Sequence, residues 1–224
     1  MTLDRWGDHH EADCERVNRI RTQVHDALVN LIMIMMRQGG LQGVRTEFRQ
    51  WDRAAVGTNR TRRVPDVVGW SADGLTEYVV DARISWSVMS TSSAGGAATY
   101  HSPGDMARAG EREKEDNWSE AIRRARLAGR DESRVQFVPF SLEISGVWGP
   151  AAERFFRQMA SHRRNLRDID YFHWSSQSWR DFWLNAISVC IARGRGQIGT
   201  EVARTDVFHR QATHSVSGSE GEAS

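Results

Sequence analysis

Hydrophobic residues near the N-terminus repeat at the spacing of an α-helix. They are Val17, Ile20, Val24, Leu28, Leu31, Ile32 and Met35. A period of three to four residues places these side chains on one helix face, and the pair Gly39-Gly40 is typical of a helix C-terminus. The pattern predicts an amphipathic helix over residues 12–38 that packs against the rest of the domain.

β-Branched and aromatic residues are frequent in the segments that follow. The expected strands are residues 44–51, 64–70 and 76–84, with a basic turn at 59–63 between the first two. Asp-Gly is a favoured central pair of two-residue hairpin turns. The pair Asp73-Gly74, within the turn 71–74, therefore predicts a hairpin between the second and third strands.

The second half of the chain alternates helical patterns with one strand. The expected elements are a Ser/Gly/Ala-rich mobile loop at 87–103, a charged helix at 105–128 ended by Gly129, a core strand at 134–144, a helix that starts at Pro150 and a last helix at 178–192. Pro139 within the strand suits a strand end or a bulge. This order predicts an α/β domain over residues 16–204, after an N-terminal lead-in at 1–15 and before a disordered tail at 205–224.

Two aspartates stand at the far ends of the predicted hairpin strands. With Asp73-Gly74 as a two-residue turn, cross-strand partners have numbers that sum to 147, so Asp66 faces Asp81 on one side of the sheet. Two carboxylates about 4 Å apart repel by about 4 kcal/mol at an effective dielectric of about 20. A hard divalent cation with oxygen ligands would offset that repulsion. Arg83 points to the same face. The alternative is a shifted register that leaves both aspartates in solvent.

The overall charge demands no polyanionic partner, because 30 Lys+Arg stand against 29 Asp+Glu. Any nucleic-acid surface must therefore be a local patch. Lys114 is the only lysine in the chain. Cys14 and Cys190 lie far apart in sequence, and the longest apolar run, residues 28–36, is too short to span a bilayer. We expect an intracellular protein of a reducing compartment that is not secreted and does not cross a membrane.

The aspartate pair belongs to an ordered set of short motifs. Along the chain these are Val44-Arg45-Thr46-Glu47-Phe48, Arg63-Val64-Pro65-Asp66, Asp81-Ala82-Arg83, Lys114-Glu115-Asp116-Asn117-Trp118, Phe137-Val138-Pro139-Phe140-Ser141-Leu142-Glu143 and Gly146-Val147-Trp148-Gly149-Pro150-Ala151-Ala152. The set resembles the PD-(D/E)XK restriction-like endonuclease domain associated with the reverse transcriptases of non-LTR retrotransposons. The resemblance spans roughly residues 16–195. It implies a restriction-endonuclease-like core, with a central mixed sheet of four to five strands flanked by helices.

The resemblance also implies a function, namely a metal-dependent DNA endonuclease that nicks a phosphodiester. The implied catalytic residues are Asp66, Asp81, Lys114, Arg83 and Glu47, of which Asp66 and Asp81 would bind Mg²⁺ or Mn²⁺. Arginines that flank the acidic pair or lie on the helix of Lys114 are the candidate DNA contacts: Arg60, Arg62, Arg63, Arg112 and Arg123. The implied partners are DNA and a reverse transcriptase domain of the same element, and the implied location is the nucleus.

Three positions depart from the family pattern. Arg83 stands where the family has a lysine, and Asn117 and Trp118 replace a second lysine and a tyrosine of the helix motif. Arginine holds phosphates but cannot lose a proton to act as a base. If catalysis survives, Lys114 must therefore do the work that requires lysine. The alternative is a nuclease fold that has lost catalysis and acts as a DNA-binding or protein-interaction module.

Overall fold

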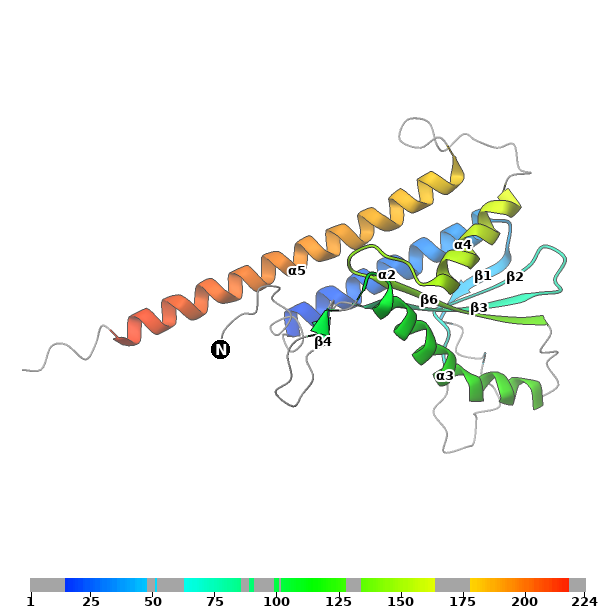
Figure 1. Cartoon of the computed structure of the whole chain (residues 1–224). Helices are drawn as coiled ribbons and strands as arrows, with labels where there is room; N and C mark the ends of the chain where they lie inside the picture. Colours follow the sequence, from blue (N-terminus) through cyan, green and yellow to red (C-terminus); the bar gives the residue numbers. More distant parts are fainter. Residues whose placement is uncertain are drawn as a thin grey trace, which may run out of the picture.

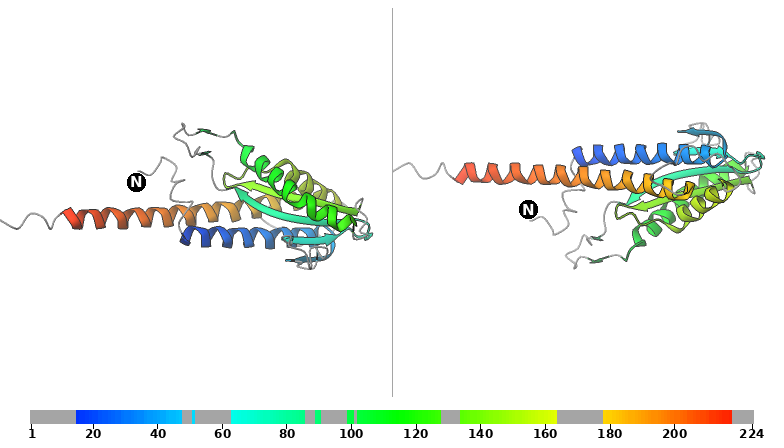
Figure 2. Two further views of the ribbon diagram at one scale, coloured as in Figure 1. Left: turned by 90° about the horizontal axis from the view of Figure 1, so that it is seen from below. Right: turned by 90° about the horizontal axis from the view of Figure 1, so that it is seen from above.

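The computed structural model describes residues 15–47, 51, 63–85, 89–90, 99–100, 102–127, 134–163 and 178–217. In this part of the chain a β-sheet lies between helices on both faces (Figure 1). The helix α5 (Trp179–Ser217) runs beside α2 (Glu15–Gln38) and continues well beyond the body of the domain, as both views of Figure 2 show. The expectation of an α/β fold is confirmed.

The central sheet has four strands and is open at both edges. Its order is β1 (Gln42–Thr46), β2 (Val67–Trp70), β3 (Glu77–Ser85) and β6 (Val135–Glu143). The first three strands are antiparallel, whereas β3 and β6 run parallel and are joined through α3 (Asp105–Leu127). A parallel pair needs such a crossover connection, so the sheet is mixed, as expected.

The hairpin register follows the sequence prediction, although its turn does not. Val67 pairs with Val80 and Trp70 with Glu77, so partner numbers sum to 147. The turn is wider than expected, because the Ser71 amide donates to the Thr76 carbonyl at 2.8 Å and leaves four residues in the loop. The loop keeps the same centre, so widening it by one residue on each side leaves the register unchanged.

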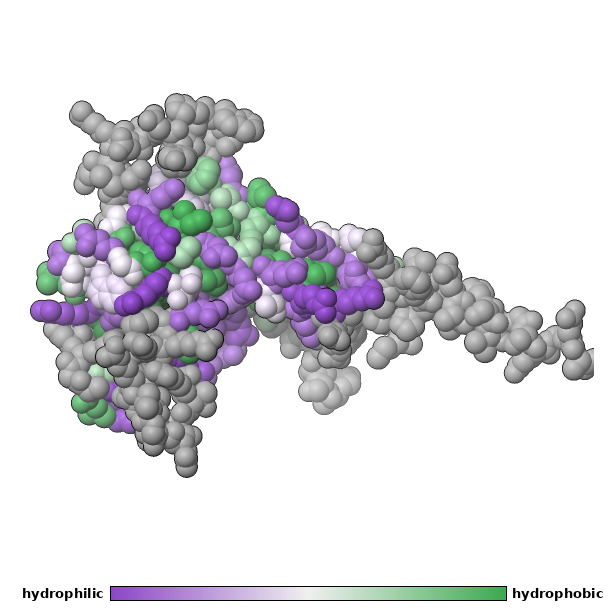
Figure 3. Space-filling model, turned by 180° about the vertical axis from the view of Figure 1, so that it is seen from behind, coloured by the Kyte–Doolittle hydropathy of each residue, from purple (hydrophilic) through white to green (hydrophobic). Residues whose placement is uncertain are grey.

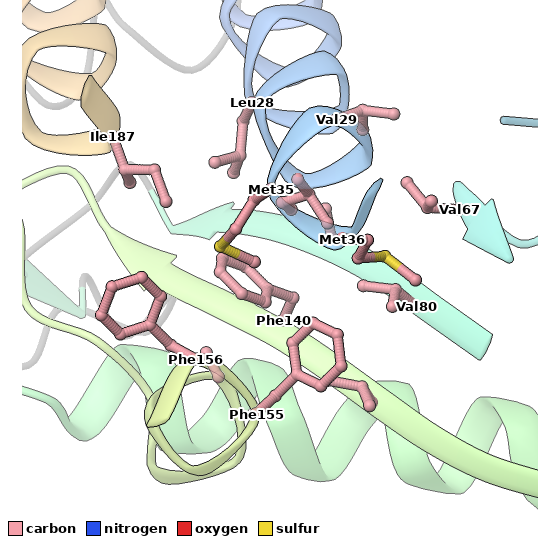
Figure 4. Packing of buried hydrophobic residues seen from close by; sticks show 14 of the residues in the cluster. Leu28, Val29, Met35, Met36, Val67, Val80, Phe140, Phe155, Phe156 and Ile187 are labelled. Atoms are coloured by element: carbon pink, nitrogen blue, oxygen red, sulfur yellow. The ribbon is translucent and has the colours of Figure 1, made fainter. Parts of the chain in front are cut away.

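Alternate residues of β3 face two different cores. Those that face α2, α4 (Pro150–Arg163) and α5 belong to the larger core, which Figure 4 shows with Met35, Phe140, Phe155 and Ile187 converging between sheet and helices. Val79 faces the other way, into a smaller core with Trp51 and Trp118 under α3. By the period of two along a strand, Asp81 and Arg83 share the α3 side of the sheet with Val79.

Several predicted boundaries need correction. The first strand ends at Thr46 rather than at residue 51. The strand β6 continues through Pro139, since an edge strand tolerates a residue without an amide hydrogen. Within the expected loop 87–103, the strands β4 (Met89–Ser90) and β5 (Thr99–Tyr100) pair in a two-stranded sheet. The last helix does not end at residue 192 but continues to Ser217.

Surface hydropathy agrees with a domain that buries its apolar residues. Figure 3, the view from behind, shows hydrophilic residues over much of the described surface, with hydrophobic ones between them. Among the residues whose burial the structure describes, the large hydrophobic side chains that remain exposed are Ile34, Val64, Leu75, Leu127 and Val189. Among the helices that the structure describes, none has both the length and the apolar character to cross a membrane.

Candidate functional site

A cleft of about 430 Å³ opens where α2, β3 and α3 approach the segment that leads into β2. Its lining residues are Arg21, Thr22, His25, Arg63, Asp81, Ala82, Arg83, Ile84, Glu113, Lys114 and Asn117. Four of the residues selected from the sequence therefore meet in one cleft: Arg63, Asp81, Arg83 and Lys114. They come from elements that are far apart along the chain, and only the fold brings them together.

Asp81 is the best-partnered acid in this cleft. Its Oδ1 atom lies 2.8 Å from Lys114 Nζ, and its Oδ2 atom accepts a hydrogen bond of 2.5 Å from the indole Nε1 of Trp118. Lys114 and Trp118 are four residues apart, so they lie on the same face of α3, the face that covers the sheet. The indole ring of Trp118 is itself fixed by stacking on Phe137, with 5.2 Å between ring centroids.

Asp66 lies at the start of β2 and is held from two sides. Its Oδ2 atom accepts the backbone N–H of Ala82 at 2.7 Å and lies 3.5 Å from Nε2 of His25. The carbonyl of Asp66 also accepts the amide of Glu47 at 3.1 Å, which continues the pairing of the sheet beyond β1. The side chain of Asp66 is 21% exposed, and it is His25 rather than Asp66 that lines the cleft.

The two carboxylates have pKa values that move apart. Burial raises the pKa of Asp81, the attraction of Lys114 opposes that rise, and the nearby charge of Asp66 adds to it. Burial also acts on Asp66, but the hydrogen bond and the positive charge of His25 outweigh it and leave the pKa of Asp66 lowered. The hydrogen bond with Asp66 in turn raises the pKa of His25. Unequal environments of this kind are frequent at functional sites, although structural ion pairs produce them too.

Each member of the acidic pair thus has its own cationic partner. Lys114 contacts Asp81, and His25 contacts Asp66. Two adjacent carboxylates repel each other unless positive charge lies near them. The structure supplies part of that charge from side chains, so the repulsion by itself does not require a metal ion.

A hard metal ion would nevertheless find suitable ligands here. Mg²⁺ is usually held by one or two carboxylates, with waters and substrate phosphate oxygens completing its coordination, and Asp66 and Asp81 could provide that pair. Within the described residues, no group of three or more His, Cys, Asp or Glu side chains is arranged to hold a metal. A metal at Asp81 would also have to displace the ammonium group of Lys114.

The other catalytic candidates lie farther from this arrangement or are already paired. Arg83 lines the cleft, and its guanidinium lies 2.5 Å from the carboxylate of Glu113. Glu47 is exposed after the end of β1, with a left-handed backbone φ of 47°, and it is not among the lining residues. The structure therefore brings Arg83 to the cleft and does not bring Glu47 there.

Only some of the candidate DNA contacts lie at the cleft. Arg63 lines the cleft and donates to Asn117 Oδ1 at 3.3 Å. Arg112 is exposed on α3 outside the cleft lining, and Arg123 makes hydrogen bonds of 2.6 and 2.8 Å to the carboxylate of Glu120. Arg60 and Arg62 lie outside the described residues.

The sequence patterns do not select the three cleft residues of α2, which are Arg21, Thr22 and His25. His25 follows the helical spacing of Val29, Ile32 and Met36, so it belongs to the row of side chains that faces the sheet. A titratable residue in a row of otherwise hydrophobic positions indicates a possible site residue. The sequence prediction treats this helix as a packing helix only and therefore does not include His25.

Two further acids, one within a motif and one three residues before a motif, have structural partners. Glu143 is buried and accepts the Met106 amide of the first turn of α3 at 3.1 Å. Glu111 is also buried, and its Oε1 accepts the Ala151 amide at the start of α4 at 2.8 Å. A carboxylate satisfies the otherwise unpaired N–H groups of a helix N-terminus. Gly149 is required there because a Cβ atom would collide with the Glu111 carboxylate.

Comparison with known proteins adds no family to this description. No protein-family model matches the chain, and no curated protein matches it.

Proposed function

We propose that the protein is a metal-dependent DNA endonuclease that nicks a phosphodiester bond, with Asp81 and Lys114 at its centre. The observation that carries the proposal is the contact between the only lysine of the chain and the buried Asp81, at 2.8 Å. A lysine on a helix and an aspartate on a strand, more than thirty residues apart, meet in an open cleft. That is the combination that the ordered motifs imply for a nuclease of the PD-(D/E)XK type.

The residues of the cleft have distinct roles in this proposal. Asp66 and Asp81 would hold Mg²⁺ or Mn²⁺, which when bound would lower the pKa of the attacking water and offset charge on the reacting phosphate. Lys114 would leave Asp81 when the metal enters and contact the water or the scissile phosphate. Its ammonium group is a compact point charge with three rotatable donors, whereas a guanidinium is a planar fork that cannot be deprotonated. Trp118 would keep Asp81 in position through its indole N–H.

A plasmid-nicking assay tests the proposal. Purified protein is incubated with supercoiled plasmid and Mg²⁺ or Mn²⁺, and the parent is compared with Asp81→Ala and with Asp73→Ala, a control at the exposed hairpin turn. The proposal expects open-circular product from the parent and from Asp73→Ala, and at least about 10²-fold less from Asp81→Ala. A parent without metal-dependent nicking, or equal nicking by Asp81→Ala, would contradict it.

A second candidate is a DNA-binding or protein-interaction module that has lost catalysis. The observation that favours it is the internal neutralisation of the acidic pair, because His25 and Lys114 already supply positive charge to Asp66 and Asp81. The ion pair between Arg83 and Glu113, at the position where the family has a lysine, points the same way. This candidate expects DNA binding without metal-dependent nicking.

The wider context of the proposed nuclease follows from the same resemblance. We propose DNA as its substrate, the nucleus as its location and a reverse transcriptase domain of the same element as its partner. A nick made by such an enzyme leaves the 3′ hydroxyl from which reverse transcription starts. Co-purification of the chain with a reverse transcriptase polypeptide would test this context separately from the chemistry.

A further inference from the structure

One side of the cleft is formed by α2, a helix that lies outside all of the sequence motifs. Arg21 and His25, one turn apart on α2, both line the cleft and are both partly buried. Arg63 reaches the same cleft from the segment before β2. Lys114 and Asp81 lie on the other elements that enclose it, α3 and β3. The cleft therefore combines the acid–lysine contact with arginines from elements outside that contact.

The lining of this cleft is positive without any metal ion. The basic side chains among the lining residues are Arg21, Arg63, Arg83 and Lys114, against the carboxylates of Asp81 and Glu113. Counting Asp66 behind His25 still leaves the positive charges in excess. Lining charges of one sign that exceed those of the other attract the opposite ion, so the excess of basic side chains in this cleft favours an anion as ligand.

The size and chemistry of the lining fit a phosphate group. A volume of about 430 Å³ has room for a phosphate with parts of its neighbouring sugars. Guanidinium groups present planar forks of N–H donors that match phosphate oxygens. Arg63 uses a donor on Asn117 Oδ1, at 3.3 Å, but each guanidinium carries five N–H groups.

We propose that Arg21 and Arg63 form a metal-independent phosphate-binding wall that holds the backbone of a nucleic-acid strand beside Asp81 and Lys114. The inference rests on the proposed function for the identity of the ligand, a nucleic-acid strand. Beyond the proposed function, Arg21 and Arg63 are the residues that hold the strand, and they hold it before a metal ion is bound. Binding and cleavage are thereby assigned to different groups in one cleft.

The test measures binding in EDTA, so that cleavage and metal are both absent. A fluorescein-labelled DNA oligonucleotide, single-stranded or duplex, is titrated with the parent, with Arg21→Gln and with Arg19→Gln, and binding is followed by fluorescence anisotropy at several salt concentrations. Arg19 lies on the same helix, is exposed and does not line the cleft. Thermal unfolding monitored by circular dichroism verifies that both variants remain folded.

The expected result is that Arg21→Gln weakens binding about 5- to 10-fold and reduces the log–log salt slope by about 0.7 on single strands or about 0.9 on duplex. Arg19→Gln should leave that slope unchanged. Equal losses in the two variants, or no binding by the parent in EDTA, would overturn the inference. Inorganic phosphate that competes as well as the oligonucleotide, at equal concentration of phosphate groups, would also overturn it in favour of a small phosphate ligand.

The outcomes separate this inference from the proposed function. If the parent nicks plasmid but Arg21→Gln binds DNA like the parent, the phosphate-binding wall is wrong and the nuclease stands. If Arg21→Gln loses binding as expected but the parent never nicks, the nuclease is wrong and the wall belongs to a DNA-binding module.

Discussion

Two pairs of acids in this protein have different surroundings, and all four acids lie within the motif set or next to it. Asp66 and Asp81 contact the side chains of His25 and Lys114 at the edge of an open cleft, and Asp66 also accepts the backbone N–H of Ala82. Glu111 and Glu143 are buried and accept backbone N–H groups at the N-termini of α4 and α3. Both pairs are compensated electrostatically, but by different partners.

The difference determines what each pair can do. A backbone N–H belongs to a packed helix and cannot leave, so Glu111 and Glu143 are fixed parts of the fold. The side chains of Lys114 and His25 can rotate away, so a metal ion or a substrate can take their place. An acid in a sequence motif is therefore a better candidate for chemistry if at least one of its partners is a side chain that can be exchanged.

The largest effect is expected from removing a buried acid. Glu111→Ala should lower the free energy of unfolding by about 3 kcal/mol, because the Ala151 and Ala152 amides lose their acceptor inside the protein. Glu115→Ala, at an exposed position one turn along α3, should stay within about 0.5 kcal/mol of the parent. Urea unfolding measures both, and equal values would show that Glu111 does not support α4.

Replacing Lys114, the side-chain partner of Asp81, should affect cleavage rather than folding. Lys114→Arg keeps the positive charge but removes the compact ammonium group, so nicking should fall by about 10²-fold with little change in DNA affinity. The opposite exchange at an exposed position of α4 outside the cleft, Arg157→Lys, should leave nicking unaltered. A Lys114→Arg variant that nicks as well as the parent would remove the lysine from the site.

A smaller effect is expected from the indole that holds Asp81. Trp118→Phe retains an aromatic ring against Phe137 but loses the N–H donor to Asp81, so the free energy of unfolding should fall by about 1–2 kcal/mol at neutral pH. Trp51→Phe, in the same cluster, is the control for lost ring volume. Urea unfolding in which Trp51→Phe costs as much as Trp118→Phe would assign the loss to packing alone.

The smallest effect concerns the pairing of His25 with Asp66 and depends on pH. The hydrogen bond to Asp66 raises the pKa of His25 above its ordinary value of 6.5, so the stabilisation is complete below that value and is lost as pH rises through the folded pKa. Asp66 has a lowered pKa, so its contribution is lost as pH falls through that folded value. The stability difference between the parent and His25→Gln should therefore be greatest near about pH 5 and shrink toward about pH 8. Thermal unfolding across this range measures it, and a difference independent of pH would contradict the pairing.

Local pattern predicted much of the fold and part of the site. The register of the hairpin strands next to Asp66 and Asp81 could be predicted because it depends only on the centre of the loop, which the Asp-Gly pair located correctly. The contact of Lys114 with Asp81 could be anticipated only from the motif resemblance, since no spacing rule relates α3 to β3. The partnership of His25 with Asp66 depends on how α2 lies across the sheet, which is a tertiary property. The same holds for the use of Glu111 and Glu143 as helix caps.

The most direct test of the account is metal binding by the acidic pair. Mn²⁺ is titrated into the parent, Asp81→Asn and the hairpin-turn variant Asp73→Asn, and the free ion is measured by electron paramagnetic resonance. The account predicts one bound Mn²⁺ per chain, displaced by Mg²⁺, in the parent and in Asp73→Asn, and its loss in Asp81→Asn. A parent that binds no Mn²⁺, or an Asp81→Asn variant that binds it equally well, would show that Lys114 and His25 are permanent partners of a structural ion-pair cluster.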